Sequence, residues 1–407
     1  MTPGRLILDD PAAPASGYRY AALGALAELF PAIGRPARRA VVPARPDPRY
    51  EVHDLQHVTA SGQPTVNGVI WLERAGVSIE FDGTVSVPSL EIGSDGVLHG
   101  RVRWGEAGSF CVEFDRPPGA VAEFSLDCYG RPRLRRESGM TALLGPVRPD
   151  AEKVASASCK IAILADPHRT VWVYPAVRAA LGDGADALDC RATIEVVPPP
   201  QDPRCWAEAS MWQGYDGVVL TGGADMERTE ALIAAADVCR RIDVPTLGLC
   251  LGMQAMCVAA ARRLPYMQDA SLEETTPEGK VLLFTRLPRS DGRTWRRLGD
   301  HEVTVNPGSS LARSLAGTGA AMGWAERMNH SYRLNPRYHS DLTESGLSII
   351  AQDKASDVVD LIEDSKNTFY VGSEGHPELT SRRQAPNPLI QAFLWSVTQT
   401  HTVRQSS

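Results

Sequence analysis

V-P-T-L-G-L-C-L-G-M-Q, residues 244–254, indicates a short buried strand that turns directly into a helix, with Cys250 between the two. The helix is predicted because the next residues, A-M-C-V-A-A-A-R-R, favour helical structure. The first turn of a helix offers unpaired N–H groups and a partial positive charge, which favour the nucleophilic thiolate form of a cysteine. Free cysteines are also common as small buried apolar side chains. The stretch alone leaves both interpretations of Cys250 open.

Strands and helices alternate around this stretch from Lys160 onward. Strands are predicted at K-I-A-I-L-A (160–165) and at Y-D-G-V-V-L-T-G-G (215–223), and helices at Y-P-A-V-R-A-A-L (174–181) and at residues 229–241. This alternation predicts a parallel α/β sheet, whose active site lies at the carboxyl ends of the strands. Gly222, Gly223 and Cys250 fall at such ends.

Residues 1–145 follow another pattern and predict a small, mainly antiparallel β domain of unknown role with an N-terminal helix at residues 16–30. Ser16 is the candidate N-cap of this helix, and the apolar residues Tyr20, Leu23, Leu26 and Phe30 lie near one face of it. Apolar and polar residues alternate between about residues 66 and 130, and Asp82-Gly83 predicts a hairpin within residues 77–87. Residues 131–158 are interpreted as an inter-domain connection, with 146–158 as the linker. Its arginine-rich start, R-P-R-L-R-R, is interpreted as a solvated face rather than a phosphate site.

The composition of the 407-residue chain narrows the function classes. A net charge of −7 does not favour nucleic acid or a membrane surface as a partner. The eight cysteines form no C-x-x-C pair, which favours a reducing compartment and predicts no metal site. No apolar run approaches the roughly 18 residues of a membrane span, and no signal peptide is recognisable. We therefore expect a soluble, cytoplasmic protein without a cofactor, and we leave open whether it forms a homo-oligomer.

A thiolate nucleophile needs a base, a group that orients the base, and donors for the oxyanion. F-Y-V-G-S-E-G-H-P-E-L, residues 369–379, predicts a strand that leads into His376-Pro377-Glu378. Proline prevents a regular helix or central strand here, so the histidine and the carboxylate two residues later can contact each other. The motif alone is also compatible with a surface turn that carries a solvated glutamate.

Together these motifs resemble the class I glutamine amidotransferase domain, and within that family they are most similar to the glutaminase domain of CTP synthases. L-G-L-C-L-G-M-Q (247–254) is nearly the family's nucleophile motif. Further matches are A-S-L-E-E (270–274), E-R-M-N-H-S-Y-R-L-N-P-R-Y (326–338) and N-P-L-I-Q-A-F-L (387–394). The order is the family's, and the resemblance covers roughly residues 159–400. It implies a doubly wound, flavodoxin-like α/β fold.

The resemblance also implies a role for each site residue. Cys250 would attack the side-chain amide of glutamine and form a γ-glutamyl thioester, while His376 transfers protons and Glu378 orients His376. The backbone N–H groups of Gly223 and Leu251 would bind the oxyanion. The positions implied for substrate binding are Gly222, Gln254, Glu274, His330, Ser331 and Tyr332.

Two positions depart from the CTP synthase pattern. Ser331 stands where those enzymes carry an arginine that helps to bind glutamine, so a hydroxyl or backbone group would replace a charge. Gly375 stands where an aromatic residue is usual before His-Pro-Glu, which we interpret as a looser pocket or as room for a different substrate. Both departures put the identity of the amide donor in doubt.

Three functions are compatible with these motifs. In the first, a glutaminase supplies ammonia to a separate synthetase or biosynthetic enzyme, since no G-x-x-x-x-G-K-[ST] phosphate loop precedes residue 159. In the second, an amidase or γ-glutamyl transferase uses the same thioester on another amide, as Ser331 and Gly375 suggest. In the third, the chain is a non-enzymatic regulatory protein, which the intact Cys, His and Glu residues argue against.

Overall fold

The computed structural model describes most of the chain. The described residues are 4–9, 20–29, 37–43, 51–83, 87–92, 97–105, 109–139, 155, 157–198, 200, 203–223, 226–288 and 295–406. Their contacts divide the chain into two compact units. The first comprises Met1–His57, Pro64–Val154 and His168–Ala179, and the second comprises Val58–Gln63, Ala155–Pro167 and Ala180–Ser407. The domain boundaries and the 146–158 linker drawn from the sequence stay predictions.

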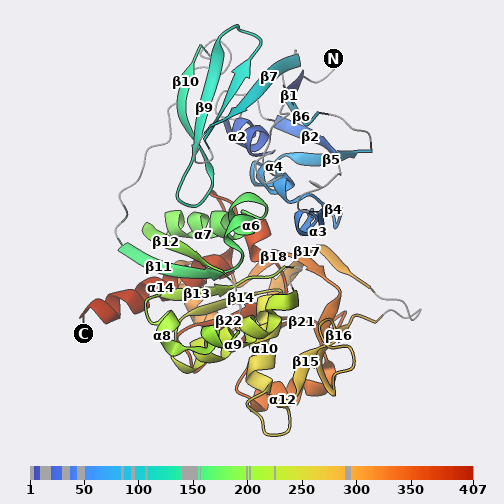
Figure 1. Cartoon of the computed structure of the whole chain (residues 1–407), viewed down its shortest axis with the longest axis vertical. Coiled ribbons are helices and arrows are strands. Elements are labelled where there is room, and N and C mark those ends of the chain that lie inside the picture. The colour runs from blue at the N-terminus through green and yellow to red at the C-terminus, as the bar shows by residue number, and fades with distance from the viewer. Residues whose placement is uncertain are drawn as a thin grey trace. The chain divides into compact units, whose positions relative to one another are not determined.

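The second unit contains a seven-stranded sheet in the order β12-β11-β13-β14-β22-β21-β20 (Figure 1). Its strands are β11 (Ala157–Leu164), β12 (Cys190–Val197), β13 (Gly217–Leu220), β14 (Thr246–Leu249), β20 (Ser348–Asp353), β21 (Val358–Glu363) and β22 (Tyr370–Ser373). The five neighbouring strands β12, β11, β13, β14 and β22 pair in parallel. Strands β21 and β20 extend the sheet beyond β22 with antiparallel pairing. The predicted doubly wound α/β fold is therefore confirmed.

Helices cover both faces of this sheet. Helix α10 packs against β13 and β14, whereas a Cβ at Gly217 of β13 would point to α14 on the other face. The main helices are α7 (Ala176–Ala187), α9 (Thr229–Arg241), α10 (Leu251–Ala261), α11 (Ser310–Thr318) and α14 (Pro388–Ser406). Shorter helices of the second unit are α8 (Ala209–Trp212), α12 (His339–Glu344) and α13 (Pro377–Thr380), whereas α6 (Pro167–Trp172) lies almost entirely in the segment His168–Ala179 of the first unit. The core between α9, α10 and the sheet is apolar, as the burial of Val218, Leu232 and Met256 shows.

Two small sheets complete the second unit. One is three-stranded, with β15 (Ala270–Leu272), β16 (Val281–Arg286) and β19 (Tyr332–Leu334). The other pairs β17 (Arg297–Thr304) with β18 (Gly323–His330) in antiparallel register. The loop between β18 and β19 is a single residue, Ser331, so these two strands join both small sheets.

The first unit is built on an eight-stranded sheet in the order β10-β9-β8-β7-β1-β6-β2-β5. Its strands are β1 (Gly4–Asp9), β2 (Ala37–Pro43), β5 (Ser78–Asp82), β6 (Ser89–Ile92), β7 (Val97–Trp104), β8 (Phe110–Phe114), β9 (Ala120–Leu126) and β10 (Pro132–Ser138). All described pairs are antiparallel except β1 with β7 and β2 with β5. The expectation of a mainly antiparallel N-terminal domain is confirmed.

The predicted N-terminal helix appears as α2 (Ala21–Leu29), accompanied by α3 (Glu51–Asp54) and α4 (Ile70–Arg74). Tyr20, Leu23 and Leu26 are buried together on the predicted apolar face. Ser16 and Phe30, the other residues of that prediction, lie outside the described residues. Spacing of apolar residues therefore placed this helix correctly.

The hairpin predicted around Asp82-Gly83 lies partly outside the described residues, because these do not include residues 84–86 of its second arm. Strand β5 ends at Asp82 and pairs in parallel with β2, and the next described strand, β6, pairs with β1 and β2. The described partner of β5 therefore comes from residues 37–43, far away in the sequence.

The arginine-rich stretch 131–136 is a strand of the first unit and not part of a connection. Arg131 is fully buried and donates from Nε to Asp127 Oδ2 at 2.9 Å, and Arg133 Nε donates to the same oxygen at 3.1 Å. Leu134 is buried between the exposed or half-buried arginines of β10. A carboxylate just before the strand compensates the charges, so the stretch can join the sheet.

A short segment of the N-terminal half, Val58–Gln63, belongs to the second unit by its contacts. The Asp300 N–H of β17 donates to Ala60 O at 3.0 Å, and the Arg327 guanidinium of β18 donates to Val58 O. Gly299 lies so close that a Cβ there would be 2.8 Å from Ala60 O. The β17–β18 pair is therefore completed by residues that precede it by more than half of the chain.

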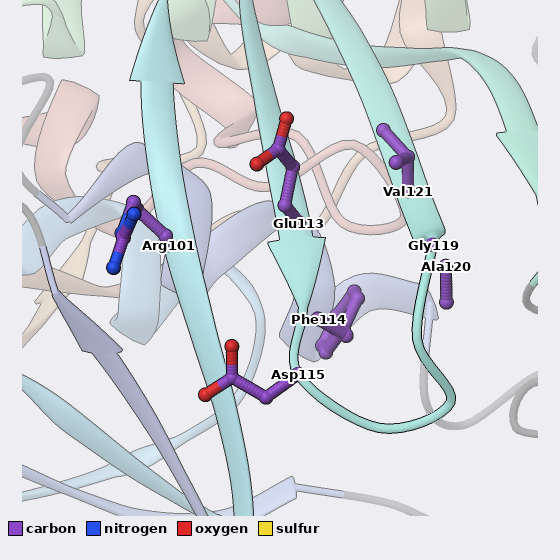
Figure 2. Close-up of a pocket in the computed structure, with 7 residues that line it drawn as sticks. All are labelled: Arg101, Glu113, Phe114, Asp115, Gly119, Ala120 and Val121. Carbon is purple, nitrogen blue, oxygen red and sulfur yellow. The ribbon is translucent and has the colours of Figure 1, made fainter.

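The first unit also contains a polar hollow of about 350 Å³ over β7, β8 and β9. Figure 2 shows Arg101, Glu113 and Asp115 at its border, with Phe114 and Val121 beside them. None of the site residues predicted from the sequence lines it. Among the helices that the structure describes, none is long and apolar enough to cross a membrane.

Candidate active site

Cys250 occupies the turn between β14 and α10, as the sequence predicts. It is the N-cap of α10 and has φ 50° and ψ −110°, a conformation that residues other than glycine rarely adopt. Such backbone strain costs on the order of 1–3 kcal/mol and persists only where surrounding structure enforces it. Here the Cys250 N–H donates to Ser373 O of β22 at 2.7 Å. The thiol is therefore held at the carboxyl end of the central strands, half-buried.

His376 and Glu378 form a buried pair directly after β22. His376 Nδ1 lies 2.8 Å from Glu378 Oε1, and both side chains are almost inaccessible to solvent. Pro377 starts the short helix α13, which places Glu378 in its first turn. The His376 N–H donates to Arg327 O at 2.8 Å, which fixes the backbone of this residue against β18. The sequence motif is therefore a buried dyad rather than a solvated surface turn.

The structure brings this dyad to Cys250. The side chains of His376 and Cys250 are within hydrogen-bonding reach. Gly222, after β13, lies beside both: a Cβ there would be 3.0 Å from Cys250 Cβ and 3.3 Å from His376 Cε1. Gly223 follows with φ 128°, a conformation natural only for glycine. Cys250, His376, Glu378 and the glycine turn thus form one cluster.

The electrostatics of the cluster favour the protonated form of His376. Burial on its own lowers the pKa of His376, but the charge of Glu378 and the contact with Cys250 outweigh burial. The net pKa of His376 is therefore well above its usual range. A protonated imidazole next to a thiol favours the thiolate, which is the nucleophilic form.

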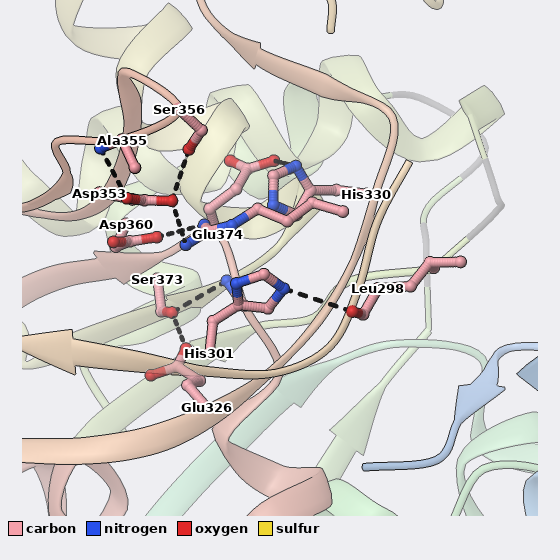
Figure 3. A network of polar contacts seen from close by, with 12 residues as sticks. Leu298, His301, Glu326, His330, Asp353, Ala355, Ser356, Asp360, Ser373 and Glu374 are labelled. Carbon is pink, nitrogen blue, oxygen red and sulfur yellow. Dashed lines mark hydrogen bonds and ion pairs between the residues drawn. The ribbon is translucent and has the colours of Figure 1, made fainter. Parts of the chain in front are cut away.

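Gln254 and His330 meet at a buried acidic residue, Glu374, that sequence reasoning missed. Gln254 Nε2 donates to Glu374 Oε1 at 2.7 Å, and His330 Nδ1 lies 3.7 Å from the same oxygen (Figure 3). His330 Nδ1 also donates to Tyr332 O at 2.8 Å. Burial lowers the pKa of His330 to about 3, so this imidazole is neutral near pH 7, and burial raises the pKa of Glu374 well above its usual range.

Glu274, Ser331 and Tyr332 lie on or beside the three-stranded sheet. Glu274 is exposed two residues after β15, and Tyr332 is buried at the start of β19. Burial raises the pKa of Tyr332, and the charge of Glu274 raises it further. Ser331 is half-buried and accepts the Leu287 N–H through its backbone oxygen. Their substrate-binding roles stay predictions.

The looser pocket expected at Gly375 is not present on the side where a Cβ would point. That space holds the carboxyl group of Glu326 from β18, with Oε1 2.6 Å from the ideal Cβ position. Glu326 and Ser373 form a hydrogen bond in the same place (Figure 3). A buried acid therefore fills space that a side chain at position 375 would need.

Glu326 and Glu374 carry a sequence signal that can be recognised once the strands are known. Both are single acidic residues within segments that are otherwise buried, W-A-E-R-M and Y-V-G-S-E. A charge on the inward face of a strand is rare unless it is paired, so it points to a polar network. Among the described residues, no group of three or more His, Cys, Asp or Glu side chains could hold a metal ion.

Comparison with known proteins shows the family to which the C-terminal part of the chain is similar. The family model of the class I glutamine amidotransferases matches residues 185–395, which is more than half of the chain. CTP synthase of Neurospora crassa is 36% identical over 184 residues, covering 44% of this chain and 31% of the relative. CTP synthase 2 of Bos taurus is 28% identical over 303 residues, covering 70% of this chain and 51% of the relative. The chain thus spans about a third to a half of the curated relatives it matches.

A solved structure supports the fold. The glutaminase domain of Trypanosoma brucei CTPS with bound acivicin aligns with a TM-score of 0.53 at 24% sequence identity. The alignment covers 59% of this chain and 94% of that domain. Together with the matched family model, it shows that the C-terminal part is an amidotransferase domain as in CTP synthase. The chain belongs to the class I glutamine amidotransferase family.

Proposed function

We propose that this protein hydrolyses the side-chain amide of glutamine through a thioester on Cys250 and supplies the ammonia to a biosynthetic enzyme. The observation that carries the proposal is the contact of Cys250 with His376, whose other ring nitrogen lies 2.8 Å from Glu378. A nucleophile, a base and an orienting carboxylate in this sequence of contacts are what acyl transfer through a thioester needs.

In the proposed reaction, the Cys250 thiolate attacks the amide carbon and the carbonyl oxygen becomes an oxyanion. The backbone N–H groups of Gly223 and Leu251 are the donors that we assign to this oxyanion. His376 gives its proton to the leaving nitrogen, so the C–N bond breaks and ammonia leaves. Neutral His376 then takes a proton from water, which attacks the thioester and releases glutamate. The balance is glutamine plus water to glutamate plus ammonia.

Glutamate formation from glutamine by the full chain tests this proposal. We expect turnover by the unmodified protein and its loss on Cys250→Ser, because a serine hydroxyl is not ionised by a neighbouring imidazolium. Cys205→Ser is the matched control, since Cys205 is exposed and remote from the cluster in sequence. Lack of glutamate, together with failure of diazo-oxo-norleucine to label Cys250, would refute the proposal and favour a non-enzymatic role.

An amidase or γ-glutamyl transferase is the second candidate, and the position of Gln254 favours it. The Gln254 amide is bound to Glu374 instead of being free for a substrate, and Ser331 offers no charge for a carboxylate. Parallel assays with glutamine and with γ-glutamyl amides separate the two candidates. Faster cleavage of a γ-glutamyl amide than of glutamine would support the second candidate.

The ammonia acceptor is also part of the proposal. The relatives named CTP synthase suggest a synthetase as the partner, and the chain covers only part of their length. We expect the rate of glutamine hydrolysis to rise when the acceptor enzyme is present. An enzyme encoded next to this protein is the first acceptor to test.

A further inference from the structure

The side chain of Glu326 fills the space that a side chain at position 375 would need. Besides Oε1 at 2.6 Å, Cγ and Cδ of Glu326 lie 2.9 and 3.0 Å from the ideal Cβ position of residue 375. Real Cβ atoms do not approach other heavy atoms this closely. The glycine at 375 and the buried acid at 326 therefore depend on each other.

The Glu326 carboxyl group is bound on both oxygens. Oε1 accepts the Ser373 hydroxyl, and Oε2 accepts Trp324 Nε1 at 2.8 Å. Ser373 Oγ in turn accepts the Gly375 N–H at 3.1 Å. Since Glu326 is fully buried, these bonds are shielded from competing water. Glu326 thus fixes the turn Ser373–Gly375 through its hydrogen bond to Ser373, which Figure 3 shows.

This turn connects the two central groups of the site. At one end, Ser373 O accepts the Cys250 N–H at 2.7 Å, and at the other end His376 follows Gly375 directly. The residue after Glu326, Arg327, accepts the His376 N–H through its backbone oxygen at 2.8 Å. Two consecutive residues of β18 therefore hold the backbone around both Cys250 and His376.

We propose that Glu326 is a positioning residue, whose carboxyl group holds the Ser373–Gly375 turn so that His376 stays in contact with Cys250. This inference rests on the function proposed above. A proton transfer between a thiol and an imidazole depends on their separation, and a displacement of about 1 Å can cost on the order of 10²-fold in rate.

Two variants of the full chain separate positioning from general stability. Glu326→Ala removes both hydrogen bonds and leaves the turn unsupported. Glu326→Gln keeps the shape, because its carbonyl oxygen can accept Trp324 Nε1 and its amide can donate to Ser373 Oγ. Glu363→Ala is the matched control: Glu363 is also a buried carboxylate, but it accepts the N–H groups of Ser310 and Leu311 at the start of α11.

The readouts are kcat and KM for glutamine per folded protein, and the rate at which iodoacetamide alkylates Cys250 as a function of pH. For Glu326→Ala we expect a fall in kcat on the order of 10²-fold with little change in KM, and slower alkylation near neutral pH. Glu326→Gln should restore most of both rates. Glu363→Ala should lower stability but leave kcat and the alkylation profile of the folded protein unchanged.

The proposal is overturned if Glu326→Ala keeps the kcat and alkylation profile of the unmodified chain, or if Glu326→Gln is as impaired as Glu326→Ala. Should Glu326→Ala fail to fold, Ser373→Ala removes only the hydroxyl between Glu326 and Gly375, and the same fall in kcat is expected in smaller degree. Alkylation of Cys250 by iodoacetamide does not require that the protein binds glutamine. An unmodified chain that does not hydrolyse glutamine would refute the proposed function, while the alkylation profile would still test Glu326.

Discussion

Protonation of His376 stabilises the folded protein. The pKa of this group is raised in the folded protein, because Glu378 and Cys250 outweigh the effect of burial. A group with a raised folded pKa stabilises the fold fully below its unfolded pKa of about 6.5, and this contribution is lost as the pH rises through the folded value. His376 therefore stays protonated to a higher pH than an isolated histidine does.

Glu326 makes stability depend on pH in the same direction as His376, but over a lower pH range. Burial raises the pKa of its carboxyl group to about 7, and the charges of Asp360 and Glu378 add to this, although the hydrogen bonds from Ser373 and Trp324 oppose it. The folded protein then holds a proton that the unfolded chain has lost above its pKa of about 4.3. Stability consequently falls as the pH rises between these two values, by up to about 1.4 kcal/mol per pH unit.

Replacing Glu326 by glutamine should remove this pH-dependent loss. We predict that the free energy of unfolding of Glu326→Gln exceeds that of the unmodified protein by an amount that grows from about pH 4.3 to about pH 7 and is constant above. Urea denaturation at several pH values measures it. Glu363→Gln, which weakens the capping of α11, should be less stable than the unmodified protein near neutral pH. A difference for Glu326→Gln that does not change with pH would contradict the prediction.

Strand β17 is attached to the edge of the main sheet by a buried ion pair. Arg297 is almost fully buried and binds Asp360 of β21, and its Nη2 also lies 3.5 Å from Asp353 Oδ2 of β20. Figure 3 shows the two aspartates with Ser356, which donates to Asp353 at 2.6 Å. The buried Arg297 guanidinium thus connects the three strands through charged groups.

Removing one partner of this pair should be costly. We predict that Arg297→Met lowers the free energy of unfolding by about 3–5 kcal/mol, because it leaves Asp360 buried without its counter-charge. The double variant Arg297→Met/Asp360→Leu should recover much of the loss. Arg263→Met breaks an exposed pair with Asp237 and should cost less than about 1 kcal/mol. Equal losses of unfolding free energy for Arg297→Met and Arg263→Met would contradict the prediction that the buried ion pair contributes more than the exposed one.

The elements show which parts of the structure local sequence can predict. The turn at Cys250 and the His376–Glu378 contact depend on neighbouring residues, so their motifs indicated these local arrangements, although each motif alone left an alternative open. Strand β5 takes its described partner from residues 37–43, which no local signal in the sequence indicates. The relation between Glu326 and Gly375 was equally inaccessible, since only the pairing of β18 with the turn after β22 brings them together. Sequence periodicity gives each strand, but not its neighbour.

At the scale of the whole molecule, the segment Val58–Gln63 should be needed for the second unit to be stable. We predict that Gly299→Ala destabilises the protein by about 1–3 kcal/mol, because its Cβ would lie 2.8 Å from Ala60 O and 2.9 Å from Gly62 N. Gly319→Ala is the matched control, since Gly319 also has a positive φ but no atom within 4 Å of the ideal Cβ. Thermal or urea unfolding of both variants measures the difference.

Both variants carry the same kind of backbone strain, so the comparison isolates the contact with the segment. Gly299 has φ 89° and Gly319 has φ 70°. If the two variants lose the same stability, the contact with Val58–Gln63 contributes nothing, and the loss comes from the left-handed backbone alone.

The exchange of segments between the units also bears on how such a protein can evolve. The second unit includes Val58–Gln63, and the first includes His168–Ala179, so the chain passes repeatedly from one unit to the other. A gene fusion that joined a foreign N-terminal half at residue 154 would take away the Ala60 oxygen that receives the Asp300 N–H, together with the Val58 oxygen bound by Arg327. The two halves of this gene are therefore expected to be inherited together, whereas domains separated by a single linker can be recombined freely.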